Sequence, residues 1–119
     1  MAHRFTEDVA AWATAHLPDH AVIATENWEG RVFDSSPRHF RIHWTSSLGN
    51  VPFSSLVQQG IRFVMTDSYT DGEYEGDARR FPVQAARYRA LRSKARILVV
   101  IHGDGQARPG PDMTIYQMP

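Results

Sequence analysis

The 119-residue sequence contains no cysteine, which excludes disulfide scaffolds, thiol catalysis and metal sites built from cysteine. It has no net charge either, because 13 basic residues balance 13 acidic ones, so no electrostatic field favours nucleic acid as a partner. The longest aliphatic run, residues 97–101, is far shorter than the roughly 20 residues of a membrane-spanning helix. The first residues lack the apolar segment of a signal peptide. With 42% hydrophobic residues, the chain is expected to form one small soluble domain over residues 1–119.

Motifs for phosphate binding and for a serine nucleophile are missing too. There is no G-x-G-x-x-G after the first predicted strand, no G-x-x-x-x-G-K-[ST] and no G-x-S-x-G. Gly103 and Gly105 precede a proline-rich turn rather than a helix, which indicates a hairpin turn. We therefore expect no cofactor, and no residue of the chain is identified as catalytic.

Six histidines raise the question of a metal site. His16 and His20 are four residues apart, but Pro18 between them prevents one helical face from presenting both. His39 and His43 have the same spacing in a predicted strand, where four rises of roughly 3.3 Å separate them by about 13 Å. Neither pair can share an ion unless a loop adds carboxylates, so the histidines are interpreted as solvated or packing residues and no metal is expected.

The apolar periodicity predicts an α/β fold. Helices are predicted at residues 6–17, between Pro52 and Gly60 and at 82–94, and strands at 21–25, 39–44, 61–66, 96–101 and 113–118. Alternation places the strand at 39–44 near a sheet edge, whereas the continuously apolar strand at 96–101 is expected at the centre, covered on both faces. The last strand is expected to run antiparallel to its predecessor. This order favours a small Rossmann-like three-layer domain with a mostly parallel sheet and antiparallel edge strands.

Polar and aromatic side chains follow three of the predicted strands. If the strands at 21–25, 61–66 and 97–101 are parallel, their carboxyl ends share one edge of the sheet, where open α/β folds bind ligands. The residues at that edge are Glu26, Asn27, Trp28, Asp67, Tyr69 and His102. They form a candidate rim for a small molecule.

The segment at residues 67–77 is expected to be a loop and carries five carboxylates and two tyrosines but no basic residue. Asp71 and Tyr74 join Asp67 and Tyr69 as candidates for sugar binding, since carboxylates accept hydrogen bonds from hydroxyls and aromatic rings offer flat apolar area. Paired carboxylates could also serve glycoside chemistry. The alternative is a solvated acidic surface beside residues 79–96, which hold six arginines and one lysine and are expected to include Tyr88 and Leu91 as core contacts.

Several phrases occur in the order found in one group of membrane enzymes. They are Ala-His-Leu-Pro at the end of the first helix, Ala-Val-Ile-Ala-Thr-Glu at 21–26, Ser-Leu-Gly at 47–49, Leu-Val-Gln-Gln-Gly-Ile-Arg-Phe-Val at 56–64, Asp-Ser-Tyr at 67–69, Tyr-Arg-Ala-Leu at 88–91 and the closing segment Gly-Pro-Asp-Met-Thr-Ile-Tyr at 110–116. Together they resemble the soluble C-terminal domain of bacterial polytopic glycosyltransferases that use lipid-linked sugars, similar to protein O-mannosyltransferases and aminoarabinose transferases.

The resemblance implies a domain on the extracytoplasmic face of a bacterial membrane, with the membrane-embedded part of the same polypeptide as its partner. In such enzymes the catalytic carboxylates belong to the membrane part, so none is transferred to this chain. The implied role is non-catalytic and accessory: to cap the membrane active site and help place the acceptor or its glycan. The resemblance does not give the donor sugar, and the present sequence contains no membrane helix.

Two other functions remain open. A free-standing α/β enzyme or small-molecule-binding protein would hold Glu26, Asp67 and His102 within hydrogen-bond reach of one point in a strand-end pocket. A structural or oligomerising module would instead show a large exposed apolar patch.

Overall fold

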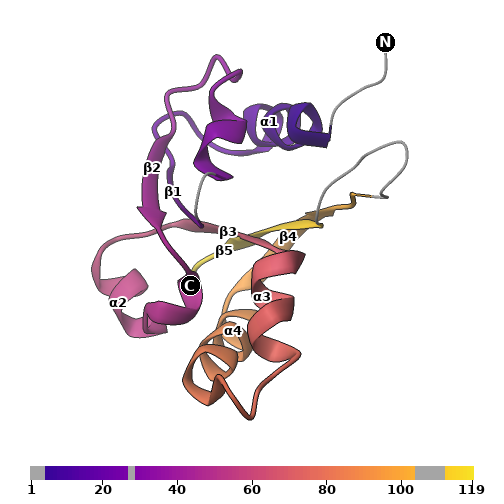
Figure 1. The fold of residues 1–119 in the computed structure, drawn as a ribbon. Coiled ribbons are helices and arrows are strands. Elements are labelled where there is room, and N and C mark those ends of the chain that lie inside the picture. The colour runs from indigo at the N-terminus through magenta and orange to yellow at the C-terminus, as the bar shows by residue number, and fades with distance from the viewer. Residues whose placement is uncertain (1–4, 27–28, 104–111) are drawn as a thin grey trace.

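The computed structural model describes residues 5–26, 29–103 and 112–119 and has the three-layer α/β architecture predicted from the sequence (Figure 1). In chain order the elements are α1 (Phe5–His16), β1 (Val22–Glu26), the 3-10 helix η1 (Glu29–Phe33), β2 (Arg41–Thr45), the 3-10 helix η2 (Leu48–Asn50), α2 (Phe53–Gln58), β3 (Phe63–Asp67), α3 (Ser68–Glu75), α4 (Pro82–Lys94), β4 (Arg96–Ile101) and β5 (Met113–Gln117). Within these described ranges, no helix combines the length and hydropathy needed to cross a membrane.

The five strands form one sheet in the order β2-β1-β3-β5-β4. Strand β1 pairs in parallel with both β2 and β3, while β5 is antiparallel to β3 and to β4. It follows that β4 runs in the same direction as β1, β2 and β3. The parallel direction predicted for β1, β3 and β4 is confirmed, and so is the antiparallel direction of the last strand.

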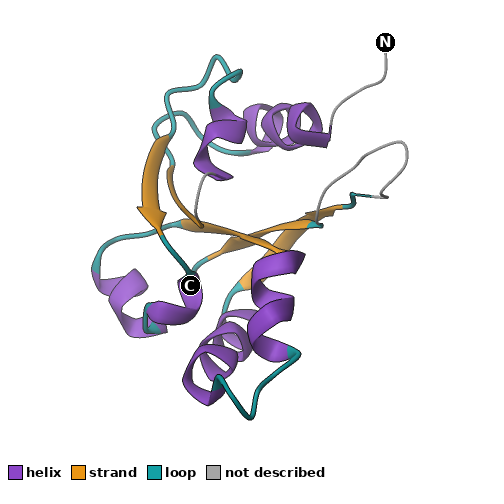
Figure 2. Cartoon of the chain, in the orientation of Figure 1, coloured by secondary structure: helices purple, strands orange, loops and turns teal. Residues whose placement is uncertain are grey.

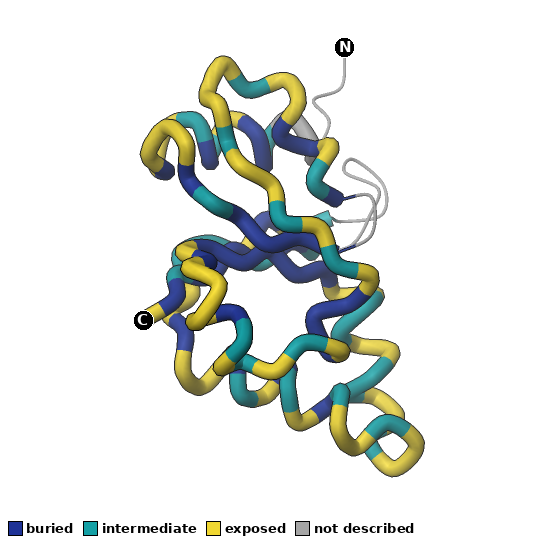
Figure 3. Tube along the Cα trace, turned by 90° about the vertical axis from the view of Figure 1, so that its left-hand side faces the viewer, coloured by how far each residue is buried: buried dark blue, intermediate teal, exposed yellow. Residues whose placement is uncertain are grey.

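Each face of the sheet is covered by helices (Figure 2). On one face, α1 and η1 cover an apolar cluster that includes Val9, Ala13 and Leu17, whose spacing of four residues predicts one apolar stripe on the first helix. On the other face, α2 and α4 cover a second cluster, to which Tyr88 and Leu91 contribute as predicted. Figure 3 shows the buried residues concentrated along the sheet between these layers.

Strand β4 lies at an edge of the sheet, so the prediction of a central position for this strand is wrong. Ile97 is 50% exposed and Val100 is 38% exposed, although both belong to the continuous apolar run. The central position next to β3 is taken by β5, because the chain returns after β4 and inserts between the two strands. A continuous apolar run indicates a strand with apolar side chains, but it does not determine where that strand lies in the sheet.

Strand β2 lies at the other edge, as its alternation predicts. Its apolar face is only partly covered: Phe40 packs against the core, but Ile42 and Trp44 remain 38% and 62% exposed. Residues 68–75 form the helix α3 rather than the predicted loop.

Candidate functional site

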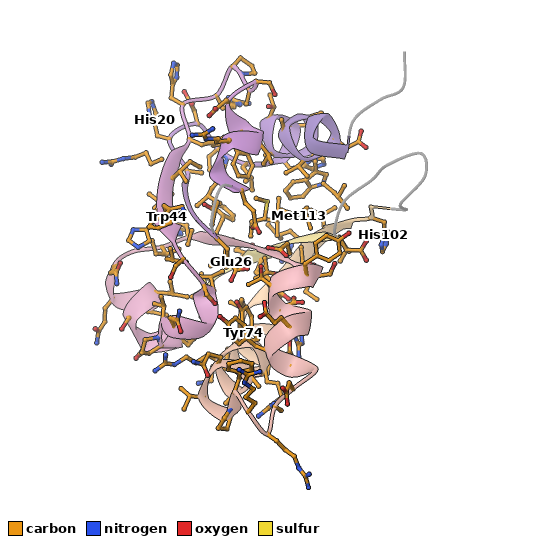
Figure 4. The ribbon with its side chains drawn as sticks, viewed as in Figure 1. His20, Glu26, Trp44, Tyr74, His102 and Met113 are labelled. Atoms are coloured by element: carbon orange, nitrogen blue, oxygen red, sulfur yellow. The ribbon has the colours of Figure 1, made fainter. Side chains whose placement is uncertain are left out.

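The carboxyl ends of β1 and β3 mark the topological switch point of the sheet. After β1 the chain turns to β2 on one side, whereas after β3 it continues to β4 and β5 on the other side. In open α/β sheets, ligands bind where neighbouring strands diverge in this way. Glu26 ends β1 and Asp67 ends β3, so both side chains lie at this point of the fold. Figure 4 shows Glu26 near the middle of the molecule, between the sheet and the helices α3 and α4.

Three carboxylates meet at the switch point, and we call them the carboxylate cluster: Glu26, Glu29 and Asp67. One oxygen from each lies within 4.8 Å of the others. All three residues are buried, with exposed fractions of 0%, 3% and 5%. Within the described ranges none of them forms an ion pair with a basic side chain. Three adjacent buried carboxylates cannot all be ionised at low free energy, so the cluster requires protons or a bound cation.

Glu26 is held by groups from two other segments of the chain, η2 and α4. Its Oε2 accepts hydrogen bonds from the Tyr88 hydroxyl and, at 2.8 Å, from the Leu48 backbone amide. The Ser47 hydroxyl lies 2.9 Å from the Tyr88 hydroxyl and extends this network. Among the described residues, the other oxygen, Oε1, has no hydrogen-bond partner, and neither has Oε1 of Glu29. The network fixes Oε2 of the Glu26 carboxylate, whereas Oε1 can accept a proton or a cation.

Burial raises the pKa of Glu26 to about 7, since the low-dielectric surroundings disfavour the charged form more than the hydrogen bonds from Tyr88 and Leu48 favour it. The pKa of Tyr88 is raised as well, first by burial and then by the adjacent Glu26. At neutral pH, Glu26 therefore exchanges a proton readily, while Tyr88 stays protonated and keeps donating its hydrogen bond.

Asp67 connects the cluster to helix α3. Its extended backbone ends β3, and its carboxylate caps the helix by accepting hydrogen bonds from the Thr70 amide at 2.7 Å and the Thr70 hydroxyl at 2.8 Å. An aspartate at this position satisfies amides that the first helical turn leaves unpaired. The same side chain thus joins the buried carboxylates and sets where α3 begins.

Helix α3 presents a polar surface beside the cluster. Tyr69 is 67% exposed on its first turn. Asp71 is half-buried, and its pKa is raised to about 6 by burial and by the neighbouring Glu75. Both guanidinium nitrogens of Arg92, from α4, bind the carboxylate of Glu75, which is the charge compensation expected between residues 67–77 and the arginine-rich segment.

Tyr74 faces the interior rather than solvent. Its ring stacks on Tyr88 with centroids 5.9 Å apart and meets Phe81 edge-on at 5.0 Å. This ring therefore fixes α3 against α4, and its packing leaves it less accessible to a ligand than the exposed ring of Tyr69. By stacking on Tyr88, the Tyr74 ring also packs against the residue whose hydroxyl donates a hydrogen bond to Glu26.

The predicted rim is brought together only in part. Glu26 and Asp67 meet as expected, but His102 is exposed and pairs with Asp112 at 3.1 Å, away from the cluster. Tyr69 lies on the outer surface of α3, where its side chain is exposed rather than directed at the cluster. Asn27 and Trp28 lie outside the described residues.

Sequence analysis missed Glu29 and the polar role of Tyr88. Glu29 opens η1 three residues after Glu26, a spacing that a turn can fold back onto the strand end. Tyr88 is correctly predicted as a core contact, but its hydroxyl needs a buried partner, and that requirement could have drawn attention to a buried carboxylate. The all-oxygen composition of the carboxylate cluster suits hard divalent cations such as Mg²⁺ or Ca²⁺.

Comparison of the chain with known protein families, curated proteins and solved structures finds no match. The resemblance to the glycosyltransferase domain therefore stays a prediction.

Proposed function

We propose that this chain is a non-catalytic binding domain that serves the membrane-embedded part of a glycosyltransferase using a lipid-linked sugar donor. The observation that supports this proposal is the convergence of the resembling phrases on one site. Glu26 ends one phrase, Ser47 and Leu48 belong to another, and Asp67 and Tyr88 begin two more. Although these phrases are spread over more than half of the chain, the side chains of Glu26, Ser47, Asp67 and Tyr88 and the backbone amide of Leu48 meet at the switch point. Segments that merely formed turns and packing would not be expected to share one polar site.

The surface of α3 offers the contacts that a glycan requires. Tyr69 exposes a flat ring, and Asp71 and Glu73 supply acceptors for sugar hydroxyls on the same helix. Asp67 fixes the start of this helix, so the buried cluster holds the outer surface in place. We propose that the acceptor or its glycan contacts α3 while the chemistry takes place in the membrane part.

Nuclear magnetic resonance of the ¹⁵N-labelled chain tests this role directly. Titration with mannose, aminoarabinose and acceptor fragments should shift the amides of residues 67–77 in a saturable manner, and Tyr69→Ala should abolish the shifts. Trp44→Ala is the matched control, because Trp44 is an equally exposed aromatic residue on β2. Saturable shifts that avoid residues 67–77, or no shifts with any of these compounds, contradict the proposed binding role.

The proposed partner and location have a separate test in the natural gene. If the chain belongs to a membrane glycosyltransferase, the same reading frame should encode several long apolar segments upstream of this domain. Topology mapping should also place the domain on the extracytoplasmic side of the membrane. A reading frame without such segments contradicts the accessory role, whatever the sugar titration shows.

A second candidate is a free-standing enzyme acting on glycosides. It is favoured by the carboxylate cluster, since glycosidases use a pair of adjacent Asp or Glu carboxyl groups. The raised pKa of Glu26 also suits a general acid. This candidate predicts hydrolysis of nitrophenyl glycosides by the purified chain, lost in Glu26→Gln and kept in Glu73→Gln, whose carboxylate is exposed on α3. Absence of turnover by the unmodified chain rejects it.

A further inference from the structure

Two histidines and an aspartate gather at the opposite end of the sheet from the carboxylate cluster. Asp19 and His20 lie in the turn before β1, and His39 lies just before β2. Strands β1 and β2 are parallel neighbours with Val22 opposite Arg41, so continuing this register by two residues places His20 opposite His39. The parallel pairing thus brings together residues that are 19 positions apart in sequence. Figure 4 shows His20 at this end of the molecule, far from Glu26.

The three side chains are arranged with their ligand atoms close together. Oδ2 of Asp19 lies 3.6 Å from Nε2 of His20 and 3.5 Å from Nδ1 of His39. One ligand atom of each residue lies within 4.8 Å of the other two. Bonds of about 2.0–2.2 Å to a tetrahedral Zn²⁺ separate the donor atoms by about 3.3–3.6 Å, so the two oxygen–nitrogen spacings already match that geometry.

The backbone holds Asp19 in the orientation that such a site needs. Its Oδ1 accepts hydrogen bonds from the His39 amide at 2.6 Å and the His20 amide at 3.2 Å, which turns Oδ2 toward the two imidazoles. The His39 amide also lowers the pKa of Asp19, which keeps the carboxylate charged. His20 has a φ of 62°, a left-handed conformation uncommon outside glycine, and the two imidazole rings stack with centroids 5.6 Å apart.

We propose that Asp19, His20 and His39 form a binding site for a divalent transition-metal ion of the Zn²⁺ type. Two imidazole nitrogens and one carboxylate oxygen suit Zn²⁺, Co²⁺, Ni²⁺ and Cu²⁺ rather than Mg²⁺ or Ca²⁺, which prefer oxygen ligands. All three side chains are accessible, with exposed fractions of 39%, 70% and 75%, so an ion can enter and water can complete its coordination. The bound ion would link the turn before β1 to the edge strand β2.

Metal titration of the chain, prepared without a polyhistidine tag, tests the site. Calorimetry with Zn²⁺ should give one equivalent bound, Co²⁺ should give the absorption of a nitrogen- and oxygen-ligated ion, and Zn²⁺ should raise the Tm. Asp19→Asn, His20→Asn and His39→Asn should each weaken binding by at least about 10-fold, since loss of a ligand exceeds the effect of losing an outer-shell partner. Asparagine is chosen at position 20 because it tolerates the left-handed backbone.

His102→Asn is the matched control. His102 and Asp112 form an exposed histidine–aspartate pair at 3.1 Å that gains no third ligand from the residues that the structure describes, so this variant should bind Zn²⁺ as the unmodified chain does. Circular dichroism checks that each variant folds, and all the substituted side chains are at the surface. Equal Zn²⁺ binding by the unmodified chain and the His20→Asn/His39→Asn double variant overturns the proposal, as does the absence of stoichiometric binding. Neither outcome affects the sugar-binding proposal, because that surface lies at the other end of the strands.

Discussion

Burial determines the chemistry of Glu26. The sequence places this residue at a strand end, where an accessible rim residue is expected, but the structure encloses it completely beneath η2 and α4. Tyr88 and Leu48 hold one oxygen of its carboxylate, and Glu29 and Asp67 add two further carboxylates nearby. Glutamate is ordinarily ionised at neutral pH. Because its pKa is raised to about 7, Glu26 is instead partly protonated at that pH.

The raised pKa of Glu26 predicts a pH-dependent stability. The pKa in the folded state, about 7, lies above the ordinary value of 4.5, so the stabilising contribution is present below pH 4.5 and is lost as the pH rises through 7. The shift corresponds to about 3 kcal/mol of unfolding free energy. In urea denaturation with a chelator present, Glu26→Gln should therefore lose less stability between pH 4.5 and pH 8 than the unmodified chain does.

The control for this experiment is Glu73→Gln. Glu73 is exposed on α3, and its substitution should leave the pH profile of the unmodified chain unchanged. The pKa of Asp71 is also raised, so Asp71 makes the unfolding free energy fall with rising pH in all three proteins. This contribution cancels when the proteins are compared. Parallel profiles for Glu26→Gln and the unmodified chain contradict the assignment.

At the scale of an element, α3 shows how tertiary contacts can form a helix that sequence periodicity does not predict. The helix contains one glycine, Gly72, and three carboxylates, and it buries none of its residues completely. Its ends and one side are nevertheless fixed: Asp67 caps the first turn, Tyr74 packs on Phe81 and Tyr88, and Arg92 binds Glu75. These partners come from other elements of the fold. A prediction based on the segment alone recognises its glycine and carboxylates as loop residues and misses the helix.

Two glycines on either side of α4 should respond oppositely to alanine. A Cβ at Gly72 in α3 meets nothing within 4 Å, so Gly72→Ala should raise the unfolding free energy by up to about 1 kcal/mol through helix propensity. A Cβ at Gly49 in η2 would lie 2.8 Å from Cε2 of Tyr88 and 3.0 Å from Cβ of Gln84. Gly49→Ala should therefore lower the unfolding free energy by about 1–3 kcal/mol.

Thermal and urea denaturation measure both substitutions. Because the Gly49 contact lies on the ring that holds Glu26, Gly49→Ala should also alter the pH profile described above, whereas Gly72→Ala should not. A Gly49→Ala protein as stable as the unmodified chain contradicts the close packing of η2 on α4.

For the whole molecule, strand order determines which apolar side chains stabilise the fold. Strand β5 is paired on both sides and buries Met113, Ile115 and Tyr116, while β4 at the edge leaves Ile97 half exposed. The more continuously apolar strand is thus the less buried one. After β4 the chain reverses direction, and β5 then pairs with β3 on one side and with β4 on the other. In this position the backbone groups on both sides of β5 are hydrogen-bonded, which stabilises the observed strand order.

A matched pair of isoleucines tests this order. Ile115→Ala in β5 should lower the unfolding free energy by about 2–5 kcal/mol, because Ile115 is fully buried. Ile97→Ala in β4 removes the same atoms from a residue that is 50% exposed and should have less than half that effect. Hydrogen exchange should likewise be slowest in β3 and β5. Equal losses for the two substitutions contradict an edge position for β4.

The sequence by itself determined the elements that depend on local periodicity and capping. Helix α4 occupies the predicted residues 82–94, the apolar stripe of α1 packs inward, and the strands β1, β3 and β5 lie close to their predicted positions. It also placed Glu26 and Asp67 at the same edge of the sheet, since the direction of parallel strands follows from the helices that connect them. These features depend on neighbours within a few residues or on connection rules.

Only the tertiary structure decided what depends on distant partners. It placed β5 between β3 and β4, formed α3, brought Glu29 and the Tyr88 hydroxyl to Glu26, and aligned His20 with His39 across β1 and β2. The physical reason is the same in each case: burial, strand order and hydrogen bonding across the fold depend on side chains far apart in the chain. Their free energies appear only once the sheet has formed.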